Sequence, residues 1–347
     1  MQLIARGDPF SVFPYYYISG SVGHGSTISS IVTAHGCEQL DALGIKQYLN
    51  KNPDDIRTCF QEIKKLPPNC DLLLENGELT LRSQEPIISD NDNLFALLVQ
   101  ALRRDTAKYS RCALALSGGI DSAMILALIK EAAINNVEIY TLATGIQEYC
   151  ELEVTKRTAR YYGVKLNVVQ ASQADFVNAL PDAISSCETP LYNLHPVSKL
   201  LLARAMKNNG VDCIITGDAA DQAFSGSVAN NYLPIVGSIM RGEGMGFASP
   251  FFDKQVVAFG LSVMDSDKSA LRKLGLSLLP EFLQHQKKQP RLAPAMNVNN
   301  YWNQKCIDQI AKQLNLQPDL HNDALKMLWT TLGMLVHTIC EKKSCAA

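Results

Sequence analysis

The sequence predicts an α/β fold in which a parallel twisted sheet is flanked by helices. From about residue 90, short apolar runs alternate with helical patterns, which is typical of an open parallel sheet. Residues 1–87 contain turn formers and short apolar runs, which indicate a small, mostly β N-terminal domain. The last third of the chain has helical spacing. We therefore expect two domains, 1–87 and 88–347.

The apolar and turn-forming residues place individual elements within these two regions. In the N-terminal region we expect a strand over 13–18, helices over 40–50 and 53–63, and a hairpin of 70–74 with 78–82 across Asn76-Gly77. In the second region we expect strands over 112–116, 137–143, 165–169 and 211–216, and helices over 91–108, 122–133, 151–162 and 196–208.

Composition excludes several classes of protein. The chain has 347 residues, of which 47% are apolar and 19% charged, and its formal net charge is −2. These values are typical of a globular protein and exclude a disordered one. The balance of charges also argues against a dedicated nucleic-acid binder, which usually carries a basic domain.

Cysteine usage and hydropathy bear on the compartment. The ten cysteines include no C-x-x-C pair, which argues against a zinc ribbon, and several lie inside apolar runs. The sequence begins without the apolar segment of a signal peptide, and no apolar run reaches the 18 residues or more that a transmembrane helix needs. We expect a cytoplasmic protein with reduced cysteines and no membrane contact.

The first chemically informative segment follows the apolar run 112–116. It reads Leu116-Ser117-Gly118-Gly119-Ile120-Asp121-Ser122. Adjacent glycines at a helix N-terminus can present backbone amides to an anion, and the serines add hydroxyl donors. A carboxylate beside a phosphate cradle is reasonable if Mg²⁺ lies between them. The alternative interpretation is a glycine turn followed by an aspartate helix cap.

This string resembles the PP-loop of the N-type ATP pyrophosphatases, which split ATP between its α and β phosphates. A second string, residues 214–226, contains Thr216-Gly217-Asp218 and Asp221 and is similar to the Ser-Gly-Glu-Gly-Ala-Asp-Glu segment of asparagine synthetases. The resemblance implies ATP and Mg²⁺ as cofactors, with Asp121 and Asp221 as the metal-binding carboxylates. Helix N-capping is the alternative role for Asp218 and Asp221. The nucleotide-binding positions that it implies are Leu116, Ser117, Gly118, Gly119, Asp121, Ser122, Thr144, Gly145, Thr216 and Gly217.

The resemblance continues toward the C-terminus. Residues 195–202 and 250–257, Lys268-x-x-Leu-Arg272 and Leu279-Pro-Glu281 are similar to family strings. By position, Lys287 corresponds to the lysine that neutralises charge on the adenylate and pyrophosphate, and Lys288 is the alternative one residue away. Lys287 and Asp218 are thus the implied catalytic residues.

The N-terminal region resembles the second half of the family's glutaminase domain, through 5–10 and 13–16. Gln2 stands where that domain has its nucleophilic cysteine, and the nearest cysteine is Cys37. We therefore expect no glutamine hydrolysis. Asp218 replaces a family glutamate, which leaves the acceptor substrate open, and it could act as a base with Tyr232 or Glu243.

The leading interpretation is an ATP-dependent ligase that adenylates a carboxylate and transfers it to an amine. Its expected partners are ATP and a small, amino-acid-like carboxylate. The amine is free ammonia, ammonia from a partner chain or homo-oligomer, or an amine of the substrate, as in β-lactam and macrolactam synthetases. No nucleic acid is expected. The alternatives are a PP-loop tRNA-modifying enzyme and a catalytically degenerate amidotransferase subunit.

Overall fold

The computed structural model describes residues 1–89, 93–146, 149–226, 232–284, 296–318 and 320–346. Within these residues a five-stranded parallel sheet has the order β11-β10-β7-β8-β9. The α/β fold class predicted from the sequence is confirmed. The strands are β7 (Cys112–Ala115), β8 (Val137–Ala143), β9 (Leu166–Gln170), β10 (Cys213–Ile215) and β11 (Gly246–Ala248).

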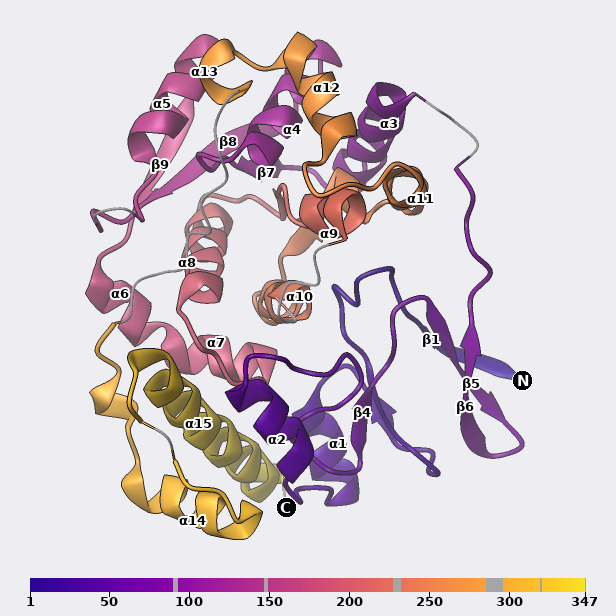
Figure 1. Ribbon diagram of the computed structural model, residues 1–347, viewed down its shortest axis with the longest axis vertical. Helices are drawn as coiled ribbons and strands as arrows, with labels where there is room; N and C mark the ends of the chain where they lie inside the picture. Colours follow the sequence, from indigo (N-terminus) through magenta and orange to yellow (C-terminus); the bar gives the residue numbers. More distant parts are fainter. Residues whose placement is uncertain (90–92, 147–148, 227–231, 285–295, 319, 347) are drawn as a thin grey trace.

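Helices cover both faces of this sheet (Figure 1). α4 (Ile120–Glu131) contacts β7 and α5 (Leu152–Tyr161) contacts β8, whereas α8 (His195–Asn208) contacts β8 and α10 (Tyr232–Gly242) contacts β11 from the other side. This division follows from right-handed crossovers between parallel strands. All four residues of β7 are buried, as expected for a strand covered on both faces.

The chain reverses its direction across the sheet at β7. From β7 it proceeds to β8 and β9 on one side, and it then returns to place β10 and β11 on the other. β7 and β10 pair directly, with Cys213 opposite Cys112 and Ile215 opposite Leu114. The loops that follow these two strands therefore leave the same edge of the sheet side by side, which is where open α/β sheets bind ligands.

The C-terminal third is helical, as predicted, whereas the helices Gln173–Asn178 and Leu180–Cys187 and strand β11 are among the elements that were not predicted. The remaining helices are α3 (Leu94–Thr106), α6 (Gln173–Asn178), α7 (Leu180–Cys187), α9 (Ala220–Ser225), η1 (Pro250–Phe252), α11 (Lys254–Ser262), α12 (Ser269–Leu278), α13 (Glu281–Gln284), η2 (Asn299–Tyr301), α14 (Gln304–Leu314) and α15 (Asp323–Ala346). No helix of the described ranges combines the length and apolarity that crossing a membrane would require.

The N-terminal region contains two small antiparallel sheets, β1-β5-β6 and β3-β2-β4. The predicted hairpin is confirmed, and its turn residues Asn76 and Gly77 have φ values of 52° and 84°, as a type I′ turn requires. The elements are β1 (Gln2–Arg6), β2 (Tyr16–Ile18), β3 (His24–Gly25), α1 (Ile28–His35), α2 (Ala42–Leu49), β4 (Ile63–Lys65), β5 (Cys70–Glu75) and β6 (Glu78–Ser83).

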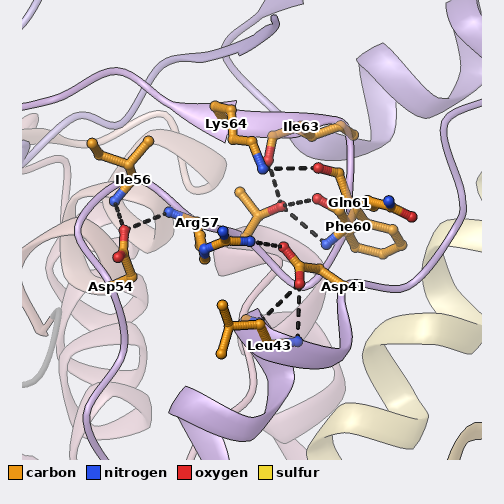
Figure 2. A network of polar contacts seen from close by, with 11 residues as sticks. Asp41, Leu43, Asp54, Ile56, Arg57, Phe60, Gln61, Ile63 and Lys64 are labelled. Atoms are coloured by element: carbon orange, nitrogen blue, oxygen red, sulfur yellow. Dashed lines mark hydrogen bonds and ion pairs between the residues drawn. The ribbon is translucent and has the colours of Figure 1, made fainter. Parts of the chain in front are cut away.

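The prediction of a helix over 53–63 is wrong. Figure 2 shows that side chains bond the local backbone instead. The Asp54 carboxylate accepts from the amides of Ile56 and Arg57 at 2.7 and 2.9 Å, and Thr58 Oγ1 bonds Phe60 and Ile63. Such local bonds compete with helical hydrogen bonds. The segment therefore forms turns that lead into β4.

The N-terminal region shares its hydrophobic core with the rest of the chain. α1 and α2 lie against the C-terminal helix α15 (Figure 1). The backbone of Val12 passes so close to Gly237 of α10 that any side chain at Gly237 would collide with it. Arg241 of α10 donates to the carbonyls of Pro14 and Ser26 at 3.0 and 2.7 Å.

Glu188 connects the two regions electrostatically. It follows α7, is 3% exposed, and accepts from the amides of Ile28 and Ser29 at the start of α1. Lys342 of α15 lies 3.4 Å from its other oxygen. A carboxylate at a helix N-terminus satisfies amides that have no partner within the helix and interacts favourably with the helix dipole.

The nine cysteines whose side chains the structure describes are all free thiols. Cys112 and Cys213 are fully buried in neighbouring strands, where they behave as small apolar residues.

Because Glu188 is buried, we expect Glu188→Ala to lower the free energy of unfolding by about 2–3 kcal/mol, since two amides lose their acceptor. Urea unfolding followed by circular dichroism would measure this change. The matched control is Glu153→Ala, which removes an exposed carboxylate paired with Lys156 and should change stability by less than about 0.5 kcal/mol. Equal effects of the two substitutions would contradict the anchoring role of Glu188.

Candidate active site

The first loop connects β7 to α4 through Ser117, Gly118 and Gly119. Ser122 Oγ accepts from the Ser117 amide at 3.1 Å and lies 3.0 Å from Ser117 Oγ, which in turn accepts from the Gly119 amide at 3.2 Å. The two serines therefore fix the shape of the loop. A Cβ at Gly118 would lie 2.6 Å from Glu151 Oε1, so a side chain at this position would have to displace Glu151.

The second loop follows β10 and is held by a different set of bonds. The Thr216 amide donates to Ala248 of β11 at 3.0 Å, and Ser249 Oγ donates to the Asp218 carbonyl at 2.8 Å. Ala219 adopts a left-handed conformation with φ of 75° and begins α9 without a side-chain cap. Helix N-capping, the alternative role considered for Asp218 and Asp221, is therefore not what their side chains do here.

The two loops touch at Gly217. A Cβ there would lie 2.9 Å from Asp121 Cβ and 2.9 Å from the Ser122 amide. Contacts under 3.0 Å are repulsive, so this position requires glycine for the loops to approach. The close approach brings the start of α4 and the start of α9 together.

Asp121 and Asp221 converge on one cation. The Lys268 ammonium lies 2.7 and 2.9 Å from the two oxygens of Asp121 and 2.9 Å from Asp221 Oδ1. The Lys268 side chain is 7% exposed and the two aspartates 22% and 25%. From the sequence we predicted that these two aspartates form a pair. Lys268 appeared there only as part of the Lys268-x-x-Leu-Arg272 string.

This donor set suits magnesium. Mg²⁺ is usually held by one or two carboxylates, with water and substrate phosphates completing its shell. Two carboxylates that already point at one positive charge meet that requirement. No group of three or more His, Cys, Asp or Glu side chains that could form a metal site occurs in the described part of the chain, so a closed structural metal centre has no support there.

A cavity of about 110 Å³ borders the first loop and extends beneath α8. Leu116 and Ser117 form one wall with Thr144, whose hydroxyl accepts from the Ile146 amide at 3.3 Å. The neighbouring Gly145 has φ of 62°. Of the nucleotide positions that the resemblance implies, Leu116, Ser117 and Thr144 therefore line one cavity.

An ion pair stands at the edge of this cavity. Lys199 Nζ lies 3.1 Å from Asp218 Oδ2, with side-chain exposures of 16% and 17%. Beside it, Tyr149 Oη is 2.9 Å from His195 Nδ1. Burial, with the Lys199 ammonium nearby, lowers the pKa of His195 to about 4, so its imidazole is neutral at pH 7. Lys199 was not identified as a site residue from the sequence.

The two proposed companions of Asp218 differ in position. The Tyr232 ring packs against His195 at 5.5 Å, and its buried hydroxyl has no hydrogen-bond partner among the described residues. Burial, and next the Asp218 charge, raise the Tyr232 pKa well above 10. Glu243 instead accepts from Arg204 at 2.8 and 3.0 Å, at the other end of α10. Tyr232 therefore belongs to the surroundings of Asp218, whereas Glu243 is engaged elsewhere.

A second cavity, of about 600 Å³, also borders the first loop. Ile120, Asp121 and Met124 of α4 face Arg272 and Leu276 of α12 across it. Asp121 thus borders this cavity and lies where the two loops touch. Lys287 and Lys288 fall outside the described residues.

Comparison with known proteins agrees with this geometry. Residues 93–237, which include both loops, match the family model described as asparagine synthase. The glutamine-hydrolyzing asparagine synthetase 1 of Bacillus subtilis is 24% identical over 239 residues, covering 65% of this chain and 37% of that protein. The amidase chry2 of Gibberella zeae is 29% identical over 271 residues, covering 65% of this chain and 38% of that protein.

The chain therefore spans less than half the length of these two relatives. Among solved structures, NMN synthetase from Francisella tularensis is 14% identical with a TM-score of 0.38, covering 68% of this chain and 91% of that one.

Proposed function

We propose that the chain, which is similar to asparagine synthetases over residues 93–237, is an ATP-dependent ligase that forms carbon–nitrogen bonds. A carboxylate oxygen of the substrate attacks the α-phosphorus of ATP, the bond to the β-phosphate breaks, and pyrophosphate leaves. An amine then attacks the acyl carbon of the adenylate, and AMP leaves. The convergence of Asp121 and Asp221 on one cation, beside a glycine loop at a helix N-terminus, carries this proposal.

The chain's own groups divide the work between the two loops. The amides of Gly118 and Gly119 and the start of α4 bind phosphate oxygens, and the cavity lined by Leu116 and Thr144 receives the nucleoside. Asp121 and Asp221 hold Mg²⁺, which when bound neutralises charge on the phosphates. Thr216 holds the second loop to β11, and Gly217 allows that loop to touch the first.

The acceptor side is assigned to the Asp218–Lys199 pair. An amino-acid-like substrate offers an ammonium to Asp218 and a carboxylate to Lys199, and the pair lies at the edge of the nucleoside cavity. Asp218 takes a proton from the attacking amine. Neutral His195 and the Tyr232 hydroxyl border the acceptor side and add no charge to it.

The substrate is tested by ATP–pyrophosphate exchange with a panel of carboxylic acids, each with and without ammonium. Exchange that depends on an amino acid supports the ligase, and product formation without added ammonia identifies an amine within the substrate. Exchange that requires tRNA would favour the tRNA-modifying alternative. Absence of ATP binding would favour a degenerate subunit.

We expect Asp121→Asn and Asp221→Asn each to abolish exchange while the fold persists. Loss of a metal-binding carboxylate removes several kcal/mol of transition-state stabilisation, which exceeds about a hundredfold in rate. Exchange rates and melting temperatures check this together. Asp105→Asn, which removes a carboxylate paired with Lys108 on the surface, is the matched control. Near-normal exchange in either active-site variant would exclude the magnesium assignment.

Lys287 is proposed as the cation that stabilises charge developing on the pyrophosphate. We expect Lys287→Ala to retain ATP binding and to lose about 10²–10³-fold in turnover, the scale of removing one preorganised charge-stabilising group. The neighbouring Lys288→Ala is the control and should change turnover little. The reverse result would move the assignment by one residue, and full activity in both would refute it.

The chain by itself should release no glutamate from glutamine. Burial, and next the neighbouring Glu62 carboxylate, raise the pKa of the Cys37 thiol to about 11, whereas a nucleophilic cysteine needs a lowered pKa. Cys59 is fully buried, and burial raises its pKa further. Glutamate formation from labelled glutamine, measured by mass spectrometry, checks this expectation. Sustained release would contradict it, whether or not a cysteine substitution removes that release.

A further inference from the structure

Lys268 occupies the space between the two carboxylates that the proposed function assigns to metal. Its ammonium donates to three carboxylate oxygens, all at 2.7–2.9 Å. It comes from the turn before α12, 147 positions from Asp121 in the chain. The ion triad therefore joins three separate segments: the starts of α4, α9 and α12.

The Lys268 backbone is fixed independently of its side chain. Its amide donates to the Asp265 carbonyl at 3.2 Å, and its own carbonyl accepts from Arg272 at 3.0 Å. Asp265 Oδ1 also accepts from the Ser269 amide at 3.0 Å. Only the four-carbon side chain is free to move, and a lysine side chain is flexible.

An ammonium and a divalent cation cannot share this space. Mg²⁺ binds oxygen at about 2.0–2.1 Å, so a metal held by both carboxylates would stand within the volume that the ammonium fills. Two cations at such a separation repel strongly in a partly buried site. Metal binding to both aspartates therefore requires the ammonium to leave.

We propose that Lys268 is a positioning residue that acts as the internal counter-ion of the metal site, so that a divalent cation binds Asp121 and Asp221 only by displacing its ammonium. The proposal rests on the assignment of those two aspartates to metal in the proposed function. Without metal, Lys268 keeps two like charges together and holds the loops in contact. It also lowers the affinity for free metal, because only the fraction of molecules with the ammonium displaced can bind. Metal then enters most favourably with ATP, whose phosphates supply further ligands.

The probe is Mn²⁺ alone, titrated without nucleotide and followed by electron paramagnetic resonance. Lys268→Met should bind Mn²⁺ about 10–100-fold more tightly than the unsubstituted chain, as removal of a competitor that forms charge-assisted hydrogen bonds implies. Lys273→Met, which removes an exposed lysine from the same helix, is the matched control and should leave the affinity unchanged. If Lys268 had a merely structural role, its substitution would not raise the affinity for Mn²⁺.

A second measurement is the melting temperature, which reports any loss of stability. Without metal, Lys268→Met should melt at a lower temperature than the unsubstituted chain, because the two carboxylates then repel, and Mn²⁺ should restore the melting temperature. If this variant does not fold, Lys268→Gln carries the same expectations. Unchanged or weaker Mn²⁺ affinity in a folded variant overturns the counter-ion role but leaves the metal site intact. Absence of Mn²⁺ binding in every form, with or without ATP, overturns the metal assignment of the proposed function as well.

Discussion

The parallel pairing of β7 with β10 is the constraint on which the site depends. It places the loops after Leu116 and Ile215 at one edge of the sheet, although about 100 positions separate them. Gly217 then allows the loops to touch, since a Cβ there would meet Asp121 and Ser122. Two aspartates this close, partly buried, would repel without a cation between them. A cation between the carboxylates, which is the Lys268 ammonium in this structure, therefore supports the loop contact that the strand pairing makes possible.

The N-terminal region packs against α10, one of the helices that cover the sheet. α10 lies against β11 on one side and against Val12 on the other, where Gly237 permits the close approach. Glu188 then joins α7 to the start of α1. Because α10 begins at Tyr232, beside His195, the N-terminal contacts also bear on the helix next to the proposed acceptor site. The N-terminal region can thus support the candidate site through packing.

Local patterns in the sequence predicted the features that depend on local chemistry. The buried run of β7, the Asn76-Gly77 hairpin and the glycine loop each have signals within a few residues. The segment 53–63 was misjudged because Asp54 and Thr58 bond their own backbone, which apolar spacing does not reveal. Lys268 and Lys199 were not predicted as site residues, for another reason. Their roles come from partners 147 and 19 positions away, which only the tertiary structure brings together.

Each half of the candidate site contains an ion pair between a lysine and an aspartate. These ion pairs limit which ligands can bind. Lys268 faces Asp121 and Asp221 on the proposed nucleotide side, and Lys199 faces Asp218 on the proposed acceptor side. Separating a partly buried ion pair leaves two poorly solvated charges, so an incoming ligand must replace each partner that it displaces. A metal–nucleotide supplies a cation for the aspartates and an anion for the lysine. An amino-acid-like substrate supplies both charges to the acceptor pair, whereas a ligand with one charge leaves either Lys199 or Asp218 uncompensated. If Asp218 and Lys199 bind the acceptor, as proposed above, this ion pair favours zwitterionic acceptors over simple acids or amines.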